Sequence, residues 1–338
     1  MKTRLGAGGS MLFRLMFVVL ALMCGAHAQA QGLKKITITQ PVASFSFLPL
    51  DYAKAAGYFE KEGLDVQQVA TRGSGPDFAA LASGEVQFNA TPGTVQVGAI
   101  RAGRNIINVY NYYNRNLFDV VISKAAAKKA GVSPDAPLKE RAAALKGLTM
   151  AMTRPGAPTD KQLRHLARIG GLREGDMKIV AIGDSPSMIG ALERGQIDGF
   201  TISIPGGRVA IKRGIAVMWV NNANGDDPSV DPFIFQSILT TGEYAKANPD
   251  VVRALIRALK RAVEDIATKS AEHVRKVVQP IYSKVDPETM ILSIEALKPA
   301  LNRKGDVTLK MAENTLLMEG ATDVTPQQLH ATFTAEYQ

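Results

Sequence analysis

Two arginines lie in glycine- and proline-rich turns, where a guanidinium group can bind an anion. Arg72 is part of the turn TRGSGP, and Arg154 is part of the turn TRPGAP. Each turn precedes a predicted helix, so unpaired backbone N–H groups and the positive end of the helix dipole would face the same ligand. A guanidinium group pairs with a carboxylate, sulfonate or phosphate through two parallel hydrogen bonds. The pattern is equally typical of an exposed surface arginine, so both interpretations stay open.

The residue types that covalent or metal chemistry needs are not grouped in this chain. His165, His273 and His330 are scattered, with no second metal ligand at helical or strand spacing. The segment GDSPS at 183–187 does not fit the nucleophile-elbow pattern, and RGSG at 72–75 lacks the lysine of a phosphate-binding loop. We therefore expect no catalytic residue, no metal site and no cofactor, and we predict that the protein is not an enzyme.

Proline recurs where predicted strands lead into predicted helices. Proline suits the first helical position because its missing N–H would be unpaired there, and a preceding Ser or Thr can cap the helix. In parallel α/β sheets these joints lie at the carboxyl ends of the strands, where ligands bind. The ordinary preference of helices to begin with proline explains any single joint. Five such joints together favour a ligand cleft. The joints are Gly75-Pro76, Thr91-Pro92, Ala157-Pro158, Ser185-Pro186 and Ile204-Pro205.

Five aromatic residues near the ends of predicted strands could form a wall of that cleft. Packing in the hydrophobic core is the commoner role for such residues. The five are Phe45, Phe47, Tyr110, Tyr112 and Tyr113.

The elements that position these residues alternate between strand and helix as far as residue 240. This rhythm indicates an α/β fold with mainly parallel sheets. Candidate strands cover residues 35–40, 65–70, 86–90, 106–113, 118–123, 148–152, 178–181, 199–203, 216–220 and 233–239. After residue 240 only helical patterns follow, at 248–268, 271–281, 286–301, 309–319 and 325–333.

Two changes in composition suggest that the chain forms two lobes. The segment SKAAAKKAGVSPDAPL at 123–138 is polar after an apolar strand, and NNANGDDPSVD at 221–231 is the richest in turn-forming residues. We predict that residues 32–123 plus 233–338 form lobe 1 and that residues 124–232 form lobe 2. Two connecting strands would act as a hinge, with the ligand between the lobes.

Residues 1–30 have the features of a secretory signal peptide. Three basic residues precede an apolar run at 15–26, and the small-residue cleavage motifs AHA and AQA follow. Cleavage would remove Cys24, the only cysteine, and leave 37 basic against 31 acidic residues. Met23 is a poor residue to precede a lipidated cysteine, so we do not expect a lipid anchor. The mild, dispersed positive charge argues against nucleic-acid binding and is compatible with an anionic ligand.

Four segments resemble the SsuA/TauA/NMT1-like periplasmic solute-binding proteins. The segment PLDYAKAAGYFEKEGLDVQ at 49–67 is similar to that family's first helix and second strand, and GSGPDFAALASGEVQFNATPGT at 73–94 to its glycine-serine turn, second helix and third strand. In the second lobe, LKGLTMAMTRPGAP at 145–158 and GDSPSMIGALERGQIDGFTIS at 183–203 resemble family segments as well. Together the resemblance covers roughly residues 35–240.

The resemblance implies a type II periplasmic-binding-protein fold that closes on a small ligand and delivers it to an ABC permease. Ligands of this family include alkylsulfonates, taurine, nitrate and thiamin-pyrimidine precursors. The implied ligand-facing residues are Ser44, Phe45, Ser46, Phe47, Arg72, Gly73, Ser74, Thr91 and Thr94 in the first lobe and Arg154, Gly156, Ala157, Thr159, Ser185 and Ser203 in the second.

We therefore expect a monomeric periplasmic binding component of an ABC importer, whose partners are a small anionic or aromatic/heterocyclic ligand and the transmembrane subunits of the permease. An enzyme of the same fold, acting on a small precursor such as a pyrimidine, is the alternative. It would need an acid–base pair, for which Asp51, Asp77 and Asp160 are the nearest acids. The cysteine-rich motif of the pyrimidine synthase branch is absent. A ligand sensor that contacts a receptor is a third possibility.

Overall fold

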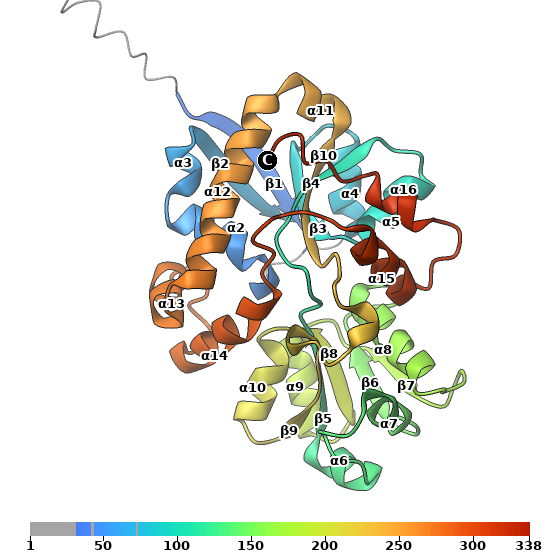
Figure 1. The fold of residues 1–338 in the computed structure, drawn as a ribbon. Coiled ribbons are helices and arrows are strands. Elements are labelled where there is room, and N and C mark those ends of the chain that lie inside the picture. Colours follow the sequence, from blue (N-terminus) through green and yellow to red (C-terminus); the bar gives the residue numbers. More distant parts are fainter. Residues whose placement is uncertain (1–31, 42–43, 72–73) are drawn as a thin grey trace, which may run out of the picture.

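The computed structural model describes residues 32–41, 44–71 and 74–338, which form two α/β lobes, one above the other in Figure 1. The predicted signal peptide with Cys24, and the turn residues Arg72 and Gly73, lie outside the described residues. Within the described part of the chain, no helix combines the length and apolar character needed to cross a bilayer.

The first lobe is built on a five-stranded sheet in the order β2-β1-β3-β10-β4. Strands β2 and β3 pair parallel with β1, whereas β10 lies antiparallel between β3 and β4. The strands are β1 (Lys34–Gln40), β2 (Leu64–Ala70), β3 (Phe88–Pro92), β4 (Ile106–Asn111) and β10 (Gln236–Thr241).

The second lobe repeats this plan with the order β7-β6-β8-β5-β9. Here β6 pairs parallel with β7 and β8, and β5 lies antiparallel between β8 and β9. The strands are β5 (Phe118–Ser123), β6 (Thr149–Met152), β7 (Lys178–Ala181), β8 (Gly199–Ser203) and β9 (Ala216–Asn221). The expectation of mainly parallel sheets is confirmed, with one antiparallel strand inserted in each.

Helices connect successive strands of each lobe or follow its last strand, and they pack on the two sheets. In the first lobe these are α2 (Leu48–Ala55), α3 (Tyr58–Lys61), α4 (Ser74–Ala82), α5 (Val95–Arg101), α11 (Gly242–Ala247) and α12 (Pro249–Thr268). In the second they are α6 (Lys124–Ala130), α7 (Leu138–Ala143), α8 (Pro158–Ile169), α9 (Ser185–Glu193) and α10 (Gly206–Lys212). Helix α12 carries apolar residues at helical spacing and buries that face in the core of the first lobe.

The C-terminal part of the chain is helical, as expected, apart from isolated β-bridges at residues 301 and 333. Met290, Ile294 and Leu297 of α14 are fully buried in the core of the first lobe. Helix α15 packs against α8 of the second lobe, so this part of the chain touches both lobes. The helices are α13 (Ala271–Val278), α14 (Pro287–Leu297), α15 (Leu309–Glu319) and α16 (Pro326–His330).

The chain passes from the first sheet to the second between residues 112 and 117, and returns between residues 222 and 235. We expected lobe 1 to continue to Ser123. That boundary is wrong by one strand, because β5 pairs with β8 and β9 of the second sheet. The change in composition at 123–138 locates the end of that strand. It does not show which sheet the strand pairs with, because the residues of an apolar strand fit either sheet. The predicted return at 232/233 falls inside the observed connection.

Gly305 holds the C-terminal segment against the first sheet. It is buried at φ +75°, and a Cβ placed on it would collide with the ring of Tyr110 in β4. Its carbonyl accepts hydrogen bonds from the Asn111 N–H at 3.0 Å and from Gln338 Nε2 at 3.1 Å. Because Asn111 is the last residue of β4, this contact fixes the start of the first connection between the lobes.

We predict that Gly305→Ala lowers the free energy of unfolding by at least about 3 kcal/mol, because backbone strain and overpacking both act there. Gly84→Ala is the matched control: Gly84 has φ +77°, but a Cβ added to it would meet no atom within 4 Å. It should lose only about 1 kcal/mol. Urea denaturation of both variants measures the difference, and equal losses would contradict the packing role of Gly305.

Candidate functional site

Two adjoining pockets lie between the lobes. The pocket at α10 has a volume of about 570 Å³ and the pocket at the start of α8 about 290 Å³. We call them the α10 pocket and the α8 pocket. Residues of both lobes line each pocket, and five line both: Ser44, Thr153, Gly183, Ile202 and Ser203. The two pockets therefore form one inter-lobe cleft.

A chain of hydrogen bonds crosses this cleft. Gln236 Nε2 donates to Ser46 Oγ at 3.1 Å, Ser46 Oγ lies 3.1 Å from Ser44 Oγ, and Ser44 Oγ lies 3.1 Å from Ser203 Oγ. Ser44 caps a short 3₁₀ turn at Phe45–Phe47 by accepting from the Ser46 N–H at 3.3 Å. Since Ser203 ends β8 of the second lobe, the chain joins a strand of each sheet.

The α8 pocket carries polar donors and one free positive charge. Arg154 is exposed and has no ion-pair partner among the described residues. Pro158 begins α8 and Ala157 precedes it in extended conformation, so the amino end of the helix faces the pocket. Thr159 Oγ1 accepts from the Thr153 N–H at 3.1 Å. This arrangement suits an anionic group, since helix N–H groups and a guanidinium lie on one wall.

Asp160 and Gly156 bind each other close to this pocket without lining it. The Gly156 N–H donates to Asp160 Oδ2 at 2.8 Å, and Arg164 Nε donates to Asp160 Oδ1 at 2.9 Å. The carboxylate of Asp160 therefore caps the turn before α8. Gly156 has φ +75°, a conformation that favours glycine, so its role in the turn is conformational.

The α10 pocket is mainly apolar, with cationic side chains at its edge. Ser185 and Pro186 begin α9 there, and Asp184 caps this helix by accepting from the Ser187 N–H at 2.8 Å. Arg213 is paired with Glu193 at 3.0 Å. The apolar lining comes from Phe45, Pro186, Ile189, Ile202, Ile204, Pro205, Val209 and Val285. Such walls suit an aliphatic or aromatic group.

Tyr282 closes the α10 pocket from the C-terminal part of the chain. Its hydroxyl donates to Asp51 Oδ2 and lies 3.3 Å from the Ser44 carbonyl oxygen. Its ring packs edge-on against Phe45, with 5.0 Å between centroids. Burial raises the pKa of Asp51 to about 6, although hydrogen bonds from Tyr282 and Gln68 oppose this shift. Burial, followed by the charge of Asp51, raises the pKa of Tyr282 well above its ordinary value.

Nine of the predicted ligand-facing residues line the cleft. They are Ser44, Phe45, Ser46, Phe47, Arg154, Ala157, Thr159, Ser185 and Ser203. Thr94, Thr91 and Gly156 line neither pocket. Alternate side chains of β3 point to opposite faces of the sheet. Pro92 therefore lines the α8 pocket, whereas Thr91 is buried on the other face. Arg72, Gly73 and the side chain of Ser74 lie outside the described residues.

Four of the five proline joints lie at the cleft, and Gly75-Pro76 does not. Pro92 lines the α8 pocket but is the last residue of β3, so the expectation that it begins a helix is wrong. Of the five aromatic candidates, only Phe45 and Phe47 line a pocket. The other three, Tyr110, Tyr112 and Tyr113, are fully buried in the core of the first lobe.

Among the cleft residues that the sequence analysis missed are Thr153, Gln236, Tyr282 and Lys284, which were missed for different reasons. Thr153 immediately precedes Arg154, so its place in the TRPGAP turn was a usable signal. Gln236 is a polar residue at the start of an apolar strand, which is a weak signal. Tyr282 and Lys284 come from the C-terminal part of the chain, and no local pattern places that segment at the cleft.

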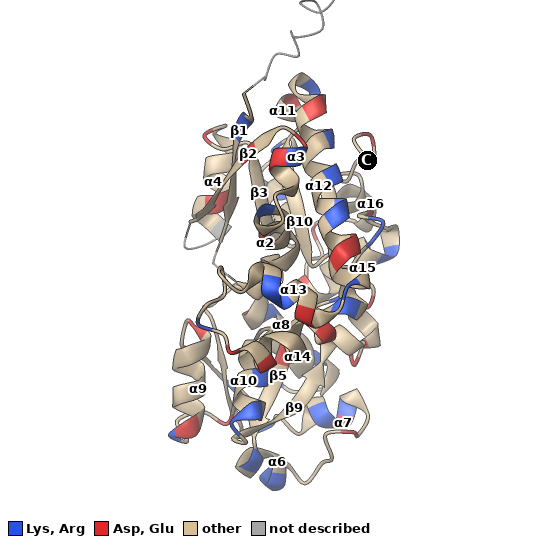
Figure 2. Cartoon of the chain, turned by 90° about the vertical axis from the view of Figure 1, so that its left-hand side faces the viewer, with Lys and Arg blue, Asp and Glu red and all other residues tan. Residues whose placement is uncertain are grey.

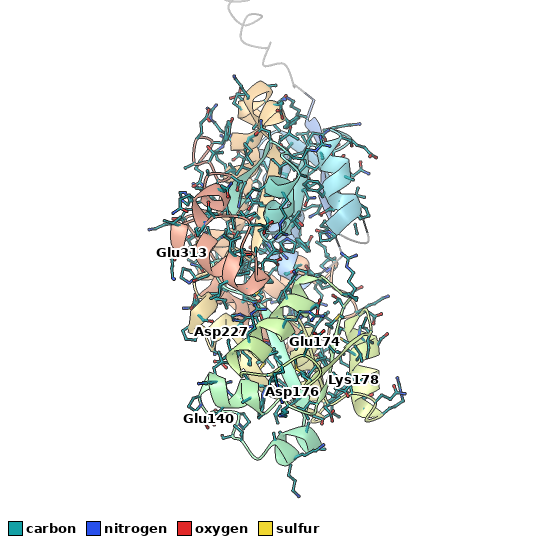
Figure 3. All side chains as sticks on the ribbon, turned by 90° about the vertical axis from the view of Figure 1, so that its right-hand side faces the viewer. Glu140, Glu174, Asp176, Lys178, Asp227 and Glu313 are labelled. Atoms are coloured by element: carbon teal, nitrogen blue, oxygen red, sulfur yellow. The ribbon has the colours of Figure 1, made fainter. Side chains whose placement is uncertain are left out.

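The buried His165 and Asp227 and the exposed Ser229 lie together near the second connection but form no catalytic triad. His165 Nε2 lies 2.9 Å from Asp227 Oδ2 and 3.3 Å from Ser229 Oγ, so both partners meet the same ring nitrogen. None of the three lines either pocket. Asp227 lies between the two lobes in Figure 3, and the cluster ties the connection to α8. No group of three potential metal ligands occurs among the residues that the structure describes.

We predict that Asp51 makes stability fall as pH rises. Its pKa of about 6 in the folded protein exceeds the 3.8 of an exposed carboxyl, so its contribution is present below pH 4 and lost as pH rises through 6. Between pH 4 and pH 7.5, wild type should lose roughly 2 kcal/mol of unfolding free energy relative to Asp51→Asn. Urea denaturation at both pH values measures this, and a difference between the two proteins that does not change with pH would contradict the assignment.

Several solved structures share this architecture, and two of the following three are described as periplasmic binding proteins. A protein from Bordetella bronchiseptica RB50 has a TM-score of 0.74 and 22% identity, covering 90% of this chain and 95% of its own. The periplasmic aliphatic sulphonate binding protein SsuA from Escherichia coli has a TM-score of 0.65 and 14% identity, with coverages of 85% and 86%. The periplasmic nitrate-binding protein NrtA from Synechocystis PCC 6803 has a TM-score of 0.64 and 14% identity, with coverages of 90% and 87%.

The family comparison gives the same result from the sequence. No curated protein matches the chain. The family model described as NMT1/THI5 like matches residues 44–272, which is more than half of the chain. The resemblance to SsuA/TauA/NMT1-like binding proteins and the expected periplasmic-binding-protein fold are both confirmed. This protein therefore belongs to the NMT1/THI5-like family and has the fold of the periplasmic binding proteins.

Proposed function

We propose that this protein is the periplasmic solute-binding component of an ABC importer. The observation that carries the proposal is the cleft itself, whose two pockets are lined from both lobes and crossed by the Ser44–Ser203 hydrogen bond. A ligand in such a cleft contacts both lobes at once. It therefore stabilises the closed arrangement over any open one, by the difference in its affinity for the two.

The ligand that these pockets suit best is a small anion with an aliphatic, aromatic or heterocyclic body. Arg154 and the amino end of α8 supply positive potential in the α8 pocket. The apolar walls of the adjoining α10 pocket are suited to the rest of the molecule. The structurally similar proteins from Escherichia coli and Synechocystis are described as binding sulphonate and nitrate, which supports an anion here.

Export and a permease partner follow from the same proposal. The sequence of residues 1–30 has the features of a secretory signal peptide, and two of the similar structures are described as periplasmic. Basic and acidic segments are mixed over both lobes in Figure 2, which favours a small ligand over a nucleic acid. We propose that the protein acts as a monomer and delivers its ligand to the transmembrane subunits of the permease.

The positions of the acidic residues favour binding over catalysis. Asp160 caps a turn, and Asp51 and Asp77 line neither pocket. Burial raises the pKa of Asp77 to about 6, but its carboxyl accepts from the Thr71 hydroxyl at 3.3 Å and does not face the cleft. We therefore propose binding without turnover.

We predict that Arg154→Ala weakens the binding of an anion by about ten- to hundredfold, because a charge-assisted hydrogen bond is lost. Arg173→Ala is the control, since Arg173 is an exposed arginine of the same lobe that lines neither pocket. The measurement is thermal shift followed by calorimetry, using benzoate, ethanesulfonate, nitrate and a pyrimidine carboxylate. Equal affinities of wild type and Arg154→Ala would remove the anion assignment, and product formation would overturn the binding function.

An ion pair joins the lobes at the outer edge of the α10 pocket. Lys212 Nζ, at the end of α10, lies 2.6 Å from Asp286 Oδ1 and 2.7 Å from Glu288 Oε2 at the start of α14. Asp286 also caps α14 by accepting from the Thr289 N–H at 3.0 Å. Because α14 is packed in the core of the first lobe, this pair ties that lobe to the second.

We predict that Lys212→Glu weakens ligand binding by up to about fivefold at low salt, since like charges then oppose closure. Adding Glu288→Lys should restore part of the affinity, and raising the salt concentration should shrink the effect. Lys310→Glu is the control, because Lys310 pairs with Glu313 within one helix. Calorimetry measures the affinities, and an unchanged affinity in Lys212→Glu would show that this pair does not act on closure.

A further inference from the structure

The side-chain amide of Gln236 leaves its oxygen without a hydrogen bond within the described residues. Gln236 is 3% exposed and lines the α8 pocket. Its Nε2 donates to Ser46 Oγ at 3.1 Å. Its Oε1 is buried and accepts no hydrogen bond within the described residues. A buried amide oxygen without a donor is costly, so such an atom in a pocket indicates where a bound molecule can supply the missing partner.

No described group donates to that oxygen in this structure, and the backbone groups near Gln236 have other partners or no N–H. Pro92, its neighbour in register on β3, has no N–H. The Tyr112 N–H donates to the Gln236 carbonyl at 3.0 Å, and the Phe118 N–H donates to Asn116 Oδ1 at 2.9 Å. The Gly93 N–H donates to the Phe235 carbonyl at 3.1 Å. A molecule bound in the α8 pocket, which Gln236 lines, can supply the missing donor.

We propose that the α8 pocket selects ligands that carry an N–H or O–H donor in addition to an anionic group, and that Gln236 Oε1 accepts that donor. The proposal rests on the binding function above and narrows its ligand class. Arg154 and the amino end of α8 hold the anionic group, and Gln236 binds the donor group from the opposite lobe. A hydroxy acid, an amino acid or a heterocyclic acid with a ring N–H meets both requirements.

A ligand without a donor would occupy the same pocket less well. It would leave Gln236 Oε1, which is already buried, without a hydrogen bond, whereas a ligand with a donor gains that bond. A site built this way favours the donor-bearing ligand over its analogue. The difference in affinity between ligands with and without a donor distinguishes the proposal from simple anion binding. In simple anion binding, Arg154 alone would decide the affinity.

The position of Gln236 also connects the ligand to the contact between the lobes. Its amide is the first member of the chain through Ser46 and Ser44 to Ser203 of the second lobe. A donor bound to Oε1 polarises the amide and strengthens the bond that Nε2 donates, because hydrogen bonds in a chain reinforce one another. Recognition of the donor group therefore supports the same hydrogen bonds that hold the lobes together.

The experiment compares matched ligands that differ only in a hydroxyl and a methyl group. The pairs are 4-hydroxybenzoate with 4-methylbenzoate, 3-hydroxybenzoate with 3-methylbenzoate, and 3-hydroxypropane-1-sulfonate with butane-1-sulfonate. Calorimetry gives the affinity of each for wild type and for Gln236→Met, which removes the amide at similar volume. A melting curve of the ligand-free variant establishes that it folds, and the wild-type ratios test the proposal independently of any variant.

In wild type, the hydroxyl member of at least one pair should bind roughly ten- to hundredfold more tightly than its methyl partner. Gln236→Met should bring that ratio to within about threefold of unity. Equal binding of both members in every pair would overturn the donor requirement and leave the binding function intact. A preference that persists in Gln236→Met would overturn the assignment to Gln236. No saturable binding of any member would overturn the proposed anion-binding function itself, together with this inference.

Discussion

The arrangement of this protein depends on two strands that the chain inserts antiparallel into otherwise parallel sheets. Strand β5 follows the first connection into the second sheet, and β10 follows the return into the first. The first sheet is complete only after the chain has crossed to the second lobe and returned, whereas the second sheet is built from one continuous segment. The insertion also aligns the two sheets so that the carboxyl ends of their parallel strands face one cleft, which is where α/β folds bind ligands.

The cleft is held by partly buried polar contacts that meet at Ser44. This residue bonds to Ser46 and Ser203, and its carbonyl lies near the Tyr282 hydroxyl, which Asp51 holds in place. These groups come from both lobes and from segments far apart in the sequence, so a small movement of one lobe changes the whole set. Packed cores shift between discrete arrangements, so such a network is suited to respond to a ligand as a unit.

The similar structures show how much ligand chemistry can vary within one fold. Proteins described as binding sulphonate and nitrate share this architecture at 14% identity. Selectivity must therefore lie in a few side chains that face the cleft, since the backbone plan is common to them all. In this protein the α8 pocket combines a guanidinium that has no ion-pair partner among the described residues, a helix amino end and an amide oxygen without a donor. The adjoining α10 pocket is lined mainly by apolar side chains.

Most strands and helices could be predicted from the sequence, because local residue patterns determine where they begin and end. Alternating apolar strands and proline-started helices placed β5, β7, β8 and α15 at their observed bounds, and the TRPGAP turn led to Arg154. Strand β5 was nevertheless assigned to the wrong lobe, because pairing partners are not encoded in a strand's own residues. Tyr282 and Gln236 reach the cleft only through packing of segments far apart in sequence. The sequence by itself determined the elements and their joints; tertiary structure decided which joints meet, because long-range burial and hydrogen bonding select the partners.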